Sequence, residues 1–216
     1  MRNINISTSG SRLTADAEYA MGLIMYAYHL KMYRISGTEA LGALGDTPYD
    51  IAAKAEGDGA PTIDEFRQML QGLLADRFKL KVHRETREMP VYELVVGKNG
   101  PKLKESAPDA SRLQYLRVNG RNYRVTNSKA TMDDVVTAIG NSFLDRPVLD
   151  KTGLTGTYDL AITYTPDIRS NRETEPDAND VNIFTAVQER LGLKLVAQKA
   201  MVEILVVDHI EKPSEN

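Results

Sequence analysis

Two stretches of this chain are nearly alike: Met89-Pro90-Val91-Tyr92-Glu93-Leu94-Val95-Val96 and Met201-Val202-Glu203-Ile204-Leu205-Val206-Val207. They align with one gap. Each follows a second run of alternating character, residues 79–84 in the first case and 193–198 in the second. Aliphatic, β-branched and aromatic residues in such short runs are typical of β-strands. We therefore expect each half of the chain to close with a pair of strands.

The same plan extends towards the start of each half. In the second half, two β-rich runs at 115–118 and 121–125 flank Asn119-Gly120, a pair that favours a tight hairpin turn. The first half has a looser version with its turn at Ser9-Gly10. Each half is thus expected to open with a hairpin.

Two helices are expected in each half. The pairs Thr62/Glu65 and Thr131/Asp134 have the spacing of capping boxes, and Thr14 is expected to cap the first helix. Apolar residues then recur at helical spacing. After Thr62 this stripe comprises Ile63, Phe66, Met69, Leu70, Leu73 and Leu74.

A strand, a turn rich in Gly and Thr, and another strand separate the two helices of each half. The second of these strands carries Tyr49-Asp50-Ile51 in one half and Tyr158-Asp159-Leu160 in the other. We predict an α+β fold made by tandem duplication, each half about ββαββαββ with its helices packed on an antiparallel-rich sheet. The first repeat would cover residues 1–104, a linker 105–112, and the second repeat 113–216.

Composition excludes several classes of protein. The 216 residues are 42% hydrophobic and 26% charged, with a formal net charge of -3, so no strong basic field would attract nucleic acid. There are no cysteines, which excludes disulfides, Cys-ligated zinc and thiol catalysis. The sequence has no apolar run long enough for a membrane span and no signal peptide at its N-terminus, so we expect no membrane insertion of this chain.

Four residues are candidates for catalysis. Asp50 and Asp159 occupy equivalent places in the two halves, so a pseudo-twofold arrangement could bring the carboxylates together for calcium binding or acid–base work. His83 and Glu85 could form a general base with its orienting carboxylate. The more ordinary explanations are backbone hydrogen bonds at strand starts for the aspartates and a solvated charge pair for the histidine.

Other residues are candidates for ligand binding. The turn Thr152–Gly156 carries two glycines, whose backbone amides could converge on an anion, although a tight turn is the simpler interpretation. Tyrosines that gather around the first helix could line a groove, or could simply pack in the core. The candidates are Tyr26, Tyr33, Tyr49, Thr152, Gly153, Gly156 and Tyr158.

Complete catalytic motifs are absent from the sequence. It contains no Gly-x-Ser-x-Gly elbow, no phosphate-binding Gly-x4-Gly-Lys-Ser/Thr loop and no His-Glu-x-x-His pair. We predict no cofactor, with calcium as the one ion that the carboxylates could hold.

Three segments carry a family resemblance: residues 73–86, residues 150–160, and the ending Asp-His-Ile-Glu-Lys-Pro-Ser-Glu-Asn at 208–216. Through them the chain resembles the soil-associated acidobacterial family of uncharacterised proteins, a domain of unknown function. The resemblance implies export to the periplasm or the medium, and fusion in some members to antirepressor-type membrane metallopeptidase sensors. It implies no catalytic residues. This chain departs from the family in lacking a leader and the usual first strand.

The sequence leaves one expected function and two alternatives to it. The first is an extracytoplasmic ligand-binding or sensory module for a small molecule or a cell-envelope ligand. The second is a hydrolase of esters or lactones, with a nonstandard and calcium-assisted site in a cleft between the repeats. The third is a structural or assembly domain with a protein partner, which an exposed hydrophobic edge strand would favour.

Overall fold

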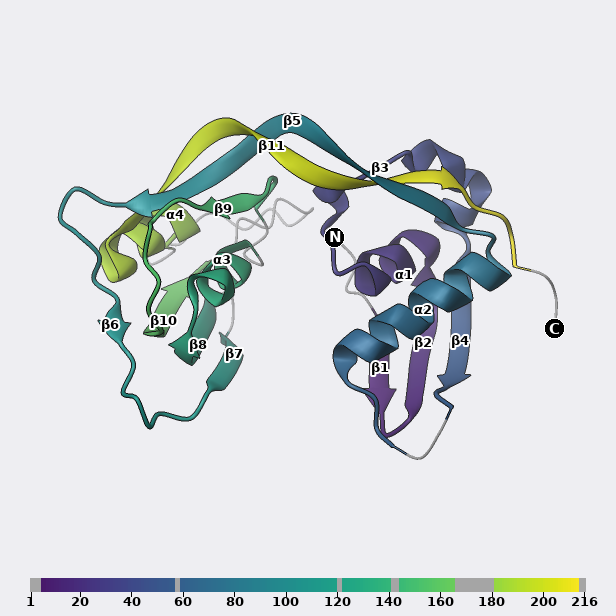
Figure 1. The fold of residues 1–216 in the computed structure, drawn as a ribbon, viewed down its shortest axis with the longest axis horizontal. Coiled ribbons are helices and arrows are strands. Elements are labelled where there is room, and N and C mark those ends of the chain that lie inside the picture. The colour runs from purple at the N-terminus through teal and green to yellow at the C-terminus, as the bar shows by residue number, and fades with distance from the viewer. Residues whose placement is uncertain (1–4, 57–58, 120–121, 141–143, 166–180, 214–216) are drawn as a thin grey trace. The chain divides into compact units, whose positions relative to one another are not determined.

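The computed structural model describes residues 5–56, 59–119, 122–140, 144–165 and 181–213 (Figure 1). Their helices and largely antiparallel sheets confirm an α+β fold. The chain divides into two compact units. Unit 1 comprises Met1–Arg87 and Met201–Asn216, and unit 2 comprises Glu88–Ala200. Neither unit has the bounds expected for a repeat, because each of two long strands begins in one unit and ends in the other.

An antiparallel sheet of three strands forms one layer of unit 1. Its order is β1 (Ile6–Ser9), β2 (Arg12–Tyr19) and β4 (Pro48–Lys54). The expected hairpin turn lies between β1 and β2, where Gly10 has a φ of 56°. Leu13 and Ala15 of β2 are buried. The sheet therefore presents its apolar face to the helices of this unit.

Helices α1 (Ala20–Ala27) and α2 (Ile63–Arg77) cover that sheet and lie side by side (Figure 1). The expectation that Thr14 caps α1 is wrong. Thr14 pairs with Ala52 inside the sheet, and α1 begins only after Tyr19, which makes no side-chain cap. Pairing with β4 therefore extended the strand through the residues assigned to the first turn.

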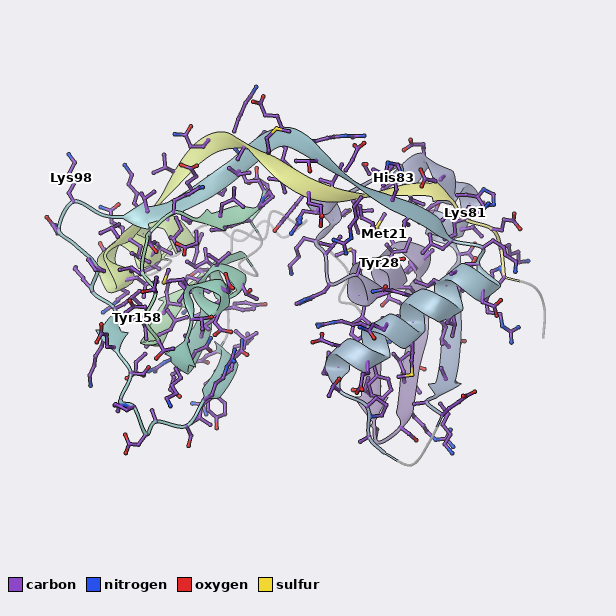
Figure 2. The ribbon with its side chains drawn as sticks, viewed as in Figure 1. Met21, Tyr28, Lys81, His83, Lys98 and Tyr158 are labelled. Carbon is purple, nitrogen blue, oxygen red and sulfur yellow. The ribbon has the colours of Figure 1, made fainter. Side chains whose placement is uncertain are left out.

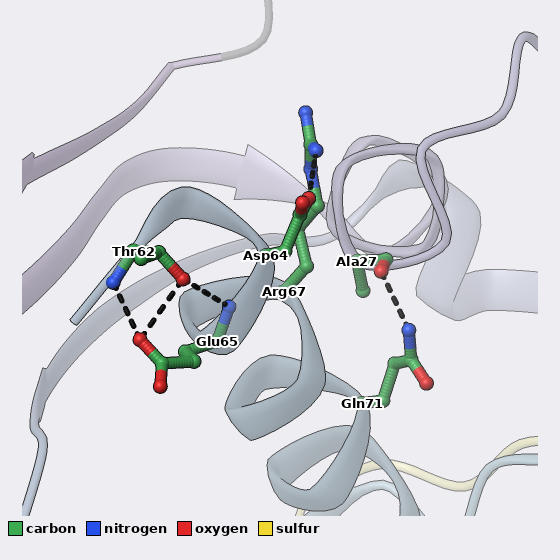
Figure 3. A network of polar contacts seen from close by, with 6 residues as sticks. All are labelled: Ala27, Thr62, Asp64, Glu65, Arg67 and Gln71. Atoms are coloured by element: carbon green, nitrogen blue, oxygen red, sulfur yellow. Dashed lines mark hydrogen bonds and ion pairs between the residues drawn. The ribbon is translucent and has the colours of Figure 1, made fainter.

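The start of α2 is the capping box that its sequence predicts (Figure 3). The Thr62 amide donates to the Glu65 carboxylate at 2.7 Å, and the Glu65 amide donates to the Thr62 hydroxyl at 3.3 Å. The hydrogen bonds from Thr62 lower the pKa of Glu65. Further along α2, the Gln71 side chain donates to the Ala27 carbonyl at 2.8 Å and ties the helix to the end of α1.

The chain between α1 and β4 is mostly 3-10 helix. The strand expected at 32–35 is instead a turn of 3-10 helix, Met32–Arg34, followed by the short β3 (Ile35–Ser36). A second 3-10 segment, Thr38–Asp46, then leads to β4. Among the described strands, β3 pairs only with β11.

Unit 2 contains a sheet of four strands in the order β6-β10-β8-β7. These are β6 (Lys104–Glu105), β7 (Leu113–Asn119), β8 (Asn122–Ala130) and β10 (Tyr158–Tyr164). The opening hairpin is β7 with β8, in which Asn119 pairs with Asn122, while Gly120 of its expected turn lies outside the described residues. Residues of the expected linker thus take part in this sheet through Glu105.

Two helical segments accompany the sheet of unit 2. The first, α3 (Met132–Gly140), starts at the predicted capping box: the Thr131 amide donates to Asp134 at 2.9 Å, and the Asp134 amide donates back at 3.3 Å. The second is α4 (Ile183–Ala186), which continues as a π-helical turn, Val187–Leu191, and ends at Gly192. Gly192 has a φ of 66°, the left-handed cap that the sequence predicts. The loop expected at 166–179 lies outside the described residues.

Two long strands belong to both units. They are β5 (Lys81–Val96) and β11 (Leu193–His209). The expectation that each closing pair forms two separate strands is wrong, since each pair is one continuous strand. Neither junction, 85–90 or 199–201, holds a glycine or an Asn-Gly pair that would reverse the chain. Pro90 keeps an extended backbone, which its fixed φ permits.

Each unit therefore contains one part of each long strand. In unit 1 the order is β3-β11-β5, and Leu205 and Val206 pair in parallel with Ile35 and Ser36. In unit 2 the order is β11-β5-β9, where β9 (Val148–Asp150) pairs in parallel with residues 92–94. Segments 88–96 and 201–209, which sequence assigned to one half, lie in the other unit.

Each unit has its own hydrophobic core. In unit 1 the core joins α1, α2 and the end of β11 through residues such as Leu23, Leu74 and Leu205. In unit 2 it joins α3, α4 and β10 through residues such as Val135, Ile183 and Leu160. Across the part of the chain that the structure describes, no helix is both long and apolar enough to span a membrane.

Candidate functional site

An apolar groove of about 430 Å³ lies in unit 1 between helix α2 and the end of the β2–β4 pair. Seven of its nine lining residues are apolar. They are Leu13, Ala53, Ala55, Phe66, Met69, Leu70 and Leu73. A volume of this size falls within the usual range for small-molecule sites, which are largely apolar with few polar groups.

The groove is hollow because small side chains face large ones. Residues 66, 69, 70 and 73 recur at helical spacing and form one stripe of α2. The sheet offers Leu13 paired with Ala53, and then Ala55, whose amide donates to the Ser11 carbonyl at 2.8 Å. The methyl side chains of Ala53 and Ala55 are too small to fill the space beneath the helix, so the groove stays open.

Two charged residues, Lys54 and Glu56, complete the lining. Phe66 and Leu70 are buried at the base, whereas Met69 is partly exposed. Methionine is flexible and adapts to ligands of different shape. The groove therefore combines an apolar floor, an adaptable wall and one charge of each sign.

The tyrosines expected to bind ligand in unit 1 do not line this groove. Tyr26 lies under Arg67, whose guanidinium carbon is 5.9 Å from the ring centroid. Tyr49 packs edge-on against Phe78, with ring centroids 5.0 Å apart. Burial raises the pKa of Tyr33, and Arg34 partly offsets that rise. Tyr26 and Tyr49 both pack against the hydrophobic core of unit 1.

Asp50 holds a bulge in the sheet of unit 1. Its carboxylate accepts a hydrogen bond from the Ala17 amide at 2.8 Å. Ala17 has a φ of 48°, and the β2–β4 register shifts between Ala15 and Glu18. The carboxylate therefore stabilises a backbone conformation that alanine adopts at a cost.

Asp159 supports the corresponding bulge in unit 2 through an intermediary. The Ser106 hydroxyl donates to Asp159 at 2.7 Å and accepts from the Lys129 amide at 3.0 Å. Lys129 has a φ of 52°, at a shift in the β8–β10 register. Asp50 and Asp159 thus lie in different units, and each has a described structural partner.

Three backbone amides of the turn at 152–156 donate hydrogen bonds to neighbouring side chains. The Thr152 amide donates to Asp150 at 2.9 Å, and the Leu154 amide donates to the Thr152 hydroxyl at 3.2 Å. The Gly156 amide donates to the buried Tyr158 hydroxyl at 3.3 Å. Gly153 supplies a φ of 71°. Amides already engaged in this way are poorly placed to bind an external anion.

His83 and Glu85 meet a third residue, Asp208, on the exposed surface of unit 1. His83 Nδ1 lies 2.9 Å from both Asp208 oxygens, and its Nε2 lies 3.8 Å from Glu85 (Figure 2 shows His83 on β5). The hydrogen bond to Asp208 raises the pKa of His83 above its usual value. Glu85 also pairs with Arg87. The cluster is exposed and contains no hydroxyl nucleophile among the described contacts of His83, so it resembles a surface ion-pair network.

Within the described ranges, no group of three or more His, Cys, Asp and Glu side chains converges in the way that a metal ion requires.

Sequence reasoning missed the groove, although it identified one of its walls. The sequence predicts the stripe of α2, but no pattern in it marks Ala53 and Ala55 as residues that line a groove. The available signal was the pairing of two small residues on a strand with a helix stripe rich in Phe, Met and Leu. Such a pattern indicates either close helix–sheet contact or a hollow, and only the structure separates them.

The structure is that of an α+β protein with an apolar groove in unit 1. The chain belongs to the family described as protein of unknown function DUF3738, whose model matches residues 21–210. No curated protein and no solved structure matches the chain.

Proposed function

We propose that this protein is a non-enzymatic binding module that holds an apolar small molecule, such as an alkyl or acyl chain, in the groove between α2 and β4. The hollow above Ala53 and Ala55 is the observation that carries the proposal. Burying a methylene group from water contributes about 0.8 kcal/mol, so an alkyl chain would gain affinity with each carbon that enters.

Binding rather than catalysis is supported by what the other candidates do. Asp50 and Asp159 hold bulges, and the turn at 152–156 hydrogen-bonds within itself. His83 is paired with Asp208 on an exposed surface. No observation favours the hydrolase alternative over this one.

A ligand series tests the proposal. Straight-chain carboxylates from butanoate to dodecanoate would be added to the full chain, and the unfolding temperature measured at each length. A ligand that binds only the folded state stabilises it by about 2.7 kcal/mol at a hundred times its dissociation constant. We expect the shift in unfolding temperature to grow with chain length and then level off when the groove is full.

Ala53→Leu is the variant that fills the groove, and Ala52→Leu is its matched control. Ala52 is the neighbouring residue of β4, is exposed, and does not line the groove. We expect Ala53→Leu to abolish the chain-length dependence and Ala52→Leu to keep it. Equal shifts in both variants, or no shift for any carboxylate, would contradict the proposal.

Three further expectations form part of this proposal. Internal duplication is supported by the shared order of elements in the two units and by the bulges at Ala17 and Lys129. An extracytoplasmic location is supported only by the resemblance to the soil-associated acidobacterial family. The same resemblance, through fusions to membrane metallopeptidase sensors, supports a sensory use of the bound molecule.

A further inference from the structure

Among the strands that the structure describes, β7 is an open edge of the unit 2 sheet. It pairs with β8 on one side, and it is the last strand in the order β6-β10-β8-β7. All seven of its residues are exposed. An edge of this kind offers unpaired backbone amides and carbonyls to another strand, and soluble proteins normally protect it.

The side chains of β7 do not protect it. Four of the seven are large and apolar: Leu113, Tyr115, Leu116 and Val118 are between 49% and 61% exposed. The strand contains no proline and a single charged residue, Arg117. Apolar surface gathered at one open edge is typical of an interaction site.

The register separates two kinds of surface on β7. Tyr115 and Arg117 pair with Thr126 and Arg124, and they share one face of the sheet with them. Leu116 and Val118 face the other way. These residues also line a surface hollow of about 610 Å³, formed by Tyr115, Leu116, Arg117, Val118, Arg124 and Thr126.

Arg117 stands directly opposite Arg124 in the β7–β8 pair. Like charges in this position destabilise a sheet. Among the described residues, neither arginine has a carboxylate partner in an ion pair. An acidic side chain from outside would relieve this repulsion, so the charge pattern specifies what should lie beside β7.

We propose that β7 docks an extended segment of a partner protein, in which acidic residues alternate with aliphatic residues. The segment adds a strand to the sheet at the free edge. Its acidic side chains face Arg117 and Arg124, and its aliphatic side chains face Leu116 and Val118. Backbone hydrogen bonds supply affinity, and the alternating side chains supply specificity.

A second copy of this chain fits the edge less well. The β7 sequence, Leu-Gln-Tyr-Leu-Arg-Val-Asn, has no acidic residue to neutralise the two arginines. Two copies paired through β7 would bring four arginines to one surface. The inference does not rest on the apolar groove, which lies in unit 1.

The test uses a capped, fluorescent octapeptide of alternating Glu and Val with the full chain, followed by fluorescence anisotropy. A peptide of the same composition with its four Glu and four Val in separate blocks controls for charge, and an alternating Lys and Val peptide controls for sign. We expect the alternating acidic peptide alone to bind, more weakly at higher salt. Binding by the block peptide with equal affinity would overturn the proposal, as would no binding by the alternating acidic peptide.

Arg117→Glu is the decisive variant. It should weaken peptide binding by about tenfold or more, because it replaces attraction by repulsion at the docked face. It should not unfold the protein, since it places opposite charges across the β7–β8 pair. Arg117→Gln is a milder second variant, expected to weaken binding by a smaller factor.

Arg12→Glu is the matched control. Arg12 also stands opposite a cation, Lys54, but its strand β2 lies between β1 and β4 and has no free edge. We expect this variant to bind the peptide as the unaltered chain does. Equal losses in Arg12→Glu and Arg117→Glu would overturn the proposal. So would a dimer, detected by light scattering, that Arg117→Glu dissociates.

Discussion

The Asp50 carboxylate lies 2.8 Å from the amide nitrogen of Ala17 and accepts its hydrogen bond at the point where β2 shifts its register against β4. Ala17 has a φ of 48°, in the left-handed region that glycine adopts without strain. The carboxylate and the strained residue therefore act on the stability of unit 1 in opposite directions.

Asp50→Ala should lower the free energy of unfolding by about 1 kcal/mol, because a charge-assisted hydrogen bond at an exposed site is lost. Ala17→Gly should raise it by about 1 kcal/mol, because the left-handed conformation no longer carries a penalty. Urea denaturation of both variants measures the two changes. If Asp50→Ala left the free energy of unfolding unchanged, the bulge would not depend on the carboxylate.

A side chain at Gly22 of α1 would require Glu18 to move. A Cβ atom there would lie 2.0 Å from a carboxylate oxygen of Glu18, which is buried and accepts hydrogen bonds from the Asn5 and Tyr19 amides. We expect Gly22→Ala to destabilise the protein by about 1–3 kcal/mol, as overpacking does, despite the better helix propensity of alanine.

Gly72 provides the control for Gly22. It lies in α2, and no neighbouring atom comes within 4 Å of the position that an alanine methyl group would take there. Gly72→Ala should therefore stabilise the protein by about 0.5–1 kcal/mol through helix propensity alone. Thermal unfolding of both variants compares the signs. Stabilisation in both would show that Glu18 moves away from Gly22 at little cost.

The His83–Asp208 pair should make stability depend on pH. The hydrogen bond to Asp208 raises the pKa of His83 in the folded state. A raised pKa stabilises the folded chain fully below the unfolded value of about 6.5, and this contribution disappears as the pH rises through the folded value. Stability should therefore decline above about pH 6.5 in the unaltered chain and decline less in Asp208→Asn.

Proton NMR titration of the three histidine rings measures this directly. Asp208→Asn should lower the pKa of His83 and leave His29 unchanged. His29 is a useful internal reference, because burial and then Arg67 lower its pKa, the opposite direction. An unchanged His83 titration in the variant would indicate that Asp208 does not hold the ring in solution.

The cap of α3 should fail at low pH. Partial burial tends to raise the pKa of Asp134, but hydrogen bonds from Thr131 and the nearby Arg112 outweigh it, and the pKa is lowered. A lowered pKa gives stability above the unfolded value of about 3.9, which is lost as the pH falls through the folded value. Asp134→Ala should thus cost about 1 kcal/mol at pH 7 and less at pH 3.

Asp133→Ala is the control for that experiment, since Asp133 lies in the same first turn of α3 without the reciprocal bonds to Thr131. It should cost only a few tenths of a kcal/mol through the helix dipole. Chemical denaturation at both pH values would contradict the assignment if the two alanine variants behaved alike.

Local features were predictable from the sequence, and pairing between distant segments was not. Thr62 with Glu65 and Thr131 with Asp134 form capping boxes because each depends on residues three apart. Gly192 ends its helix because the left-handed conformation of a glycine is also a local property of the chain. By contrast, residues 81–96 have a composition that suits either a hairpin or one long strand. The sequence therefore predicts a strand at Val91 but not the unit in which it lies.

Candidate site residues were harder still. The recurring triplet marks Asp50 in the sequence, but the bulge that its carboxylate holds is visible only in the backbone dihedral angles of the structure. No sequence pattern marks Ala53, because a small residue contributes to a groove by the space it leaves. The open edge at β7 was likewise invisible, since exposure depends on which strand occupies the neighbouring position.

The exchange of β5 and β11 between units has a consequence for synthesis of the protein. The Arg34 guanidinium donates to the Glu203 carbonyl, a residue 169 positions later in the chain. At translation rates of about 5–20 residues per second, the nascent unit 1 must wait on the order of ten seconds for its last strand after residue 87 has been made. Its β3 and β5 backbones are without their partner for that time, so a chaperone would meet the N-terminal unit before the C-terminal one. Unit 2, which is one continuous segment, can finish folding first.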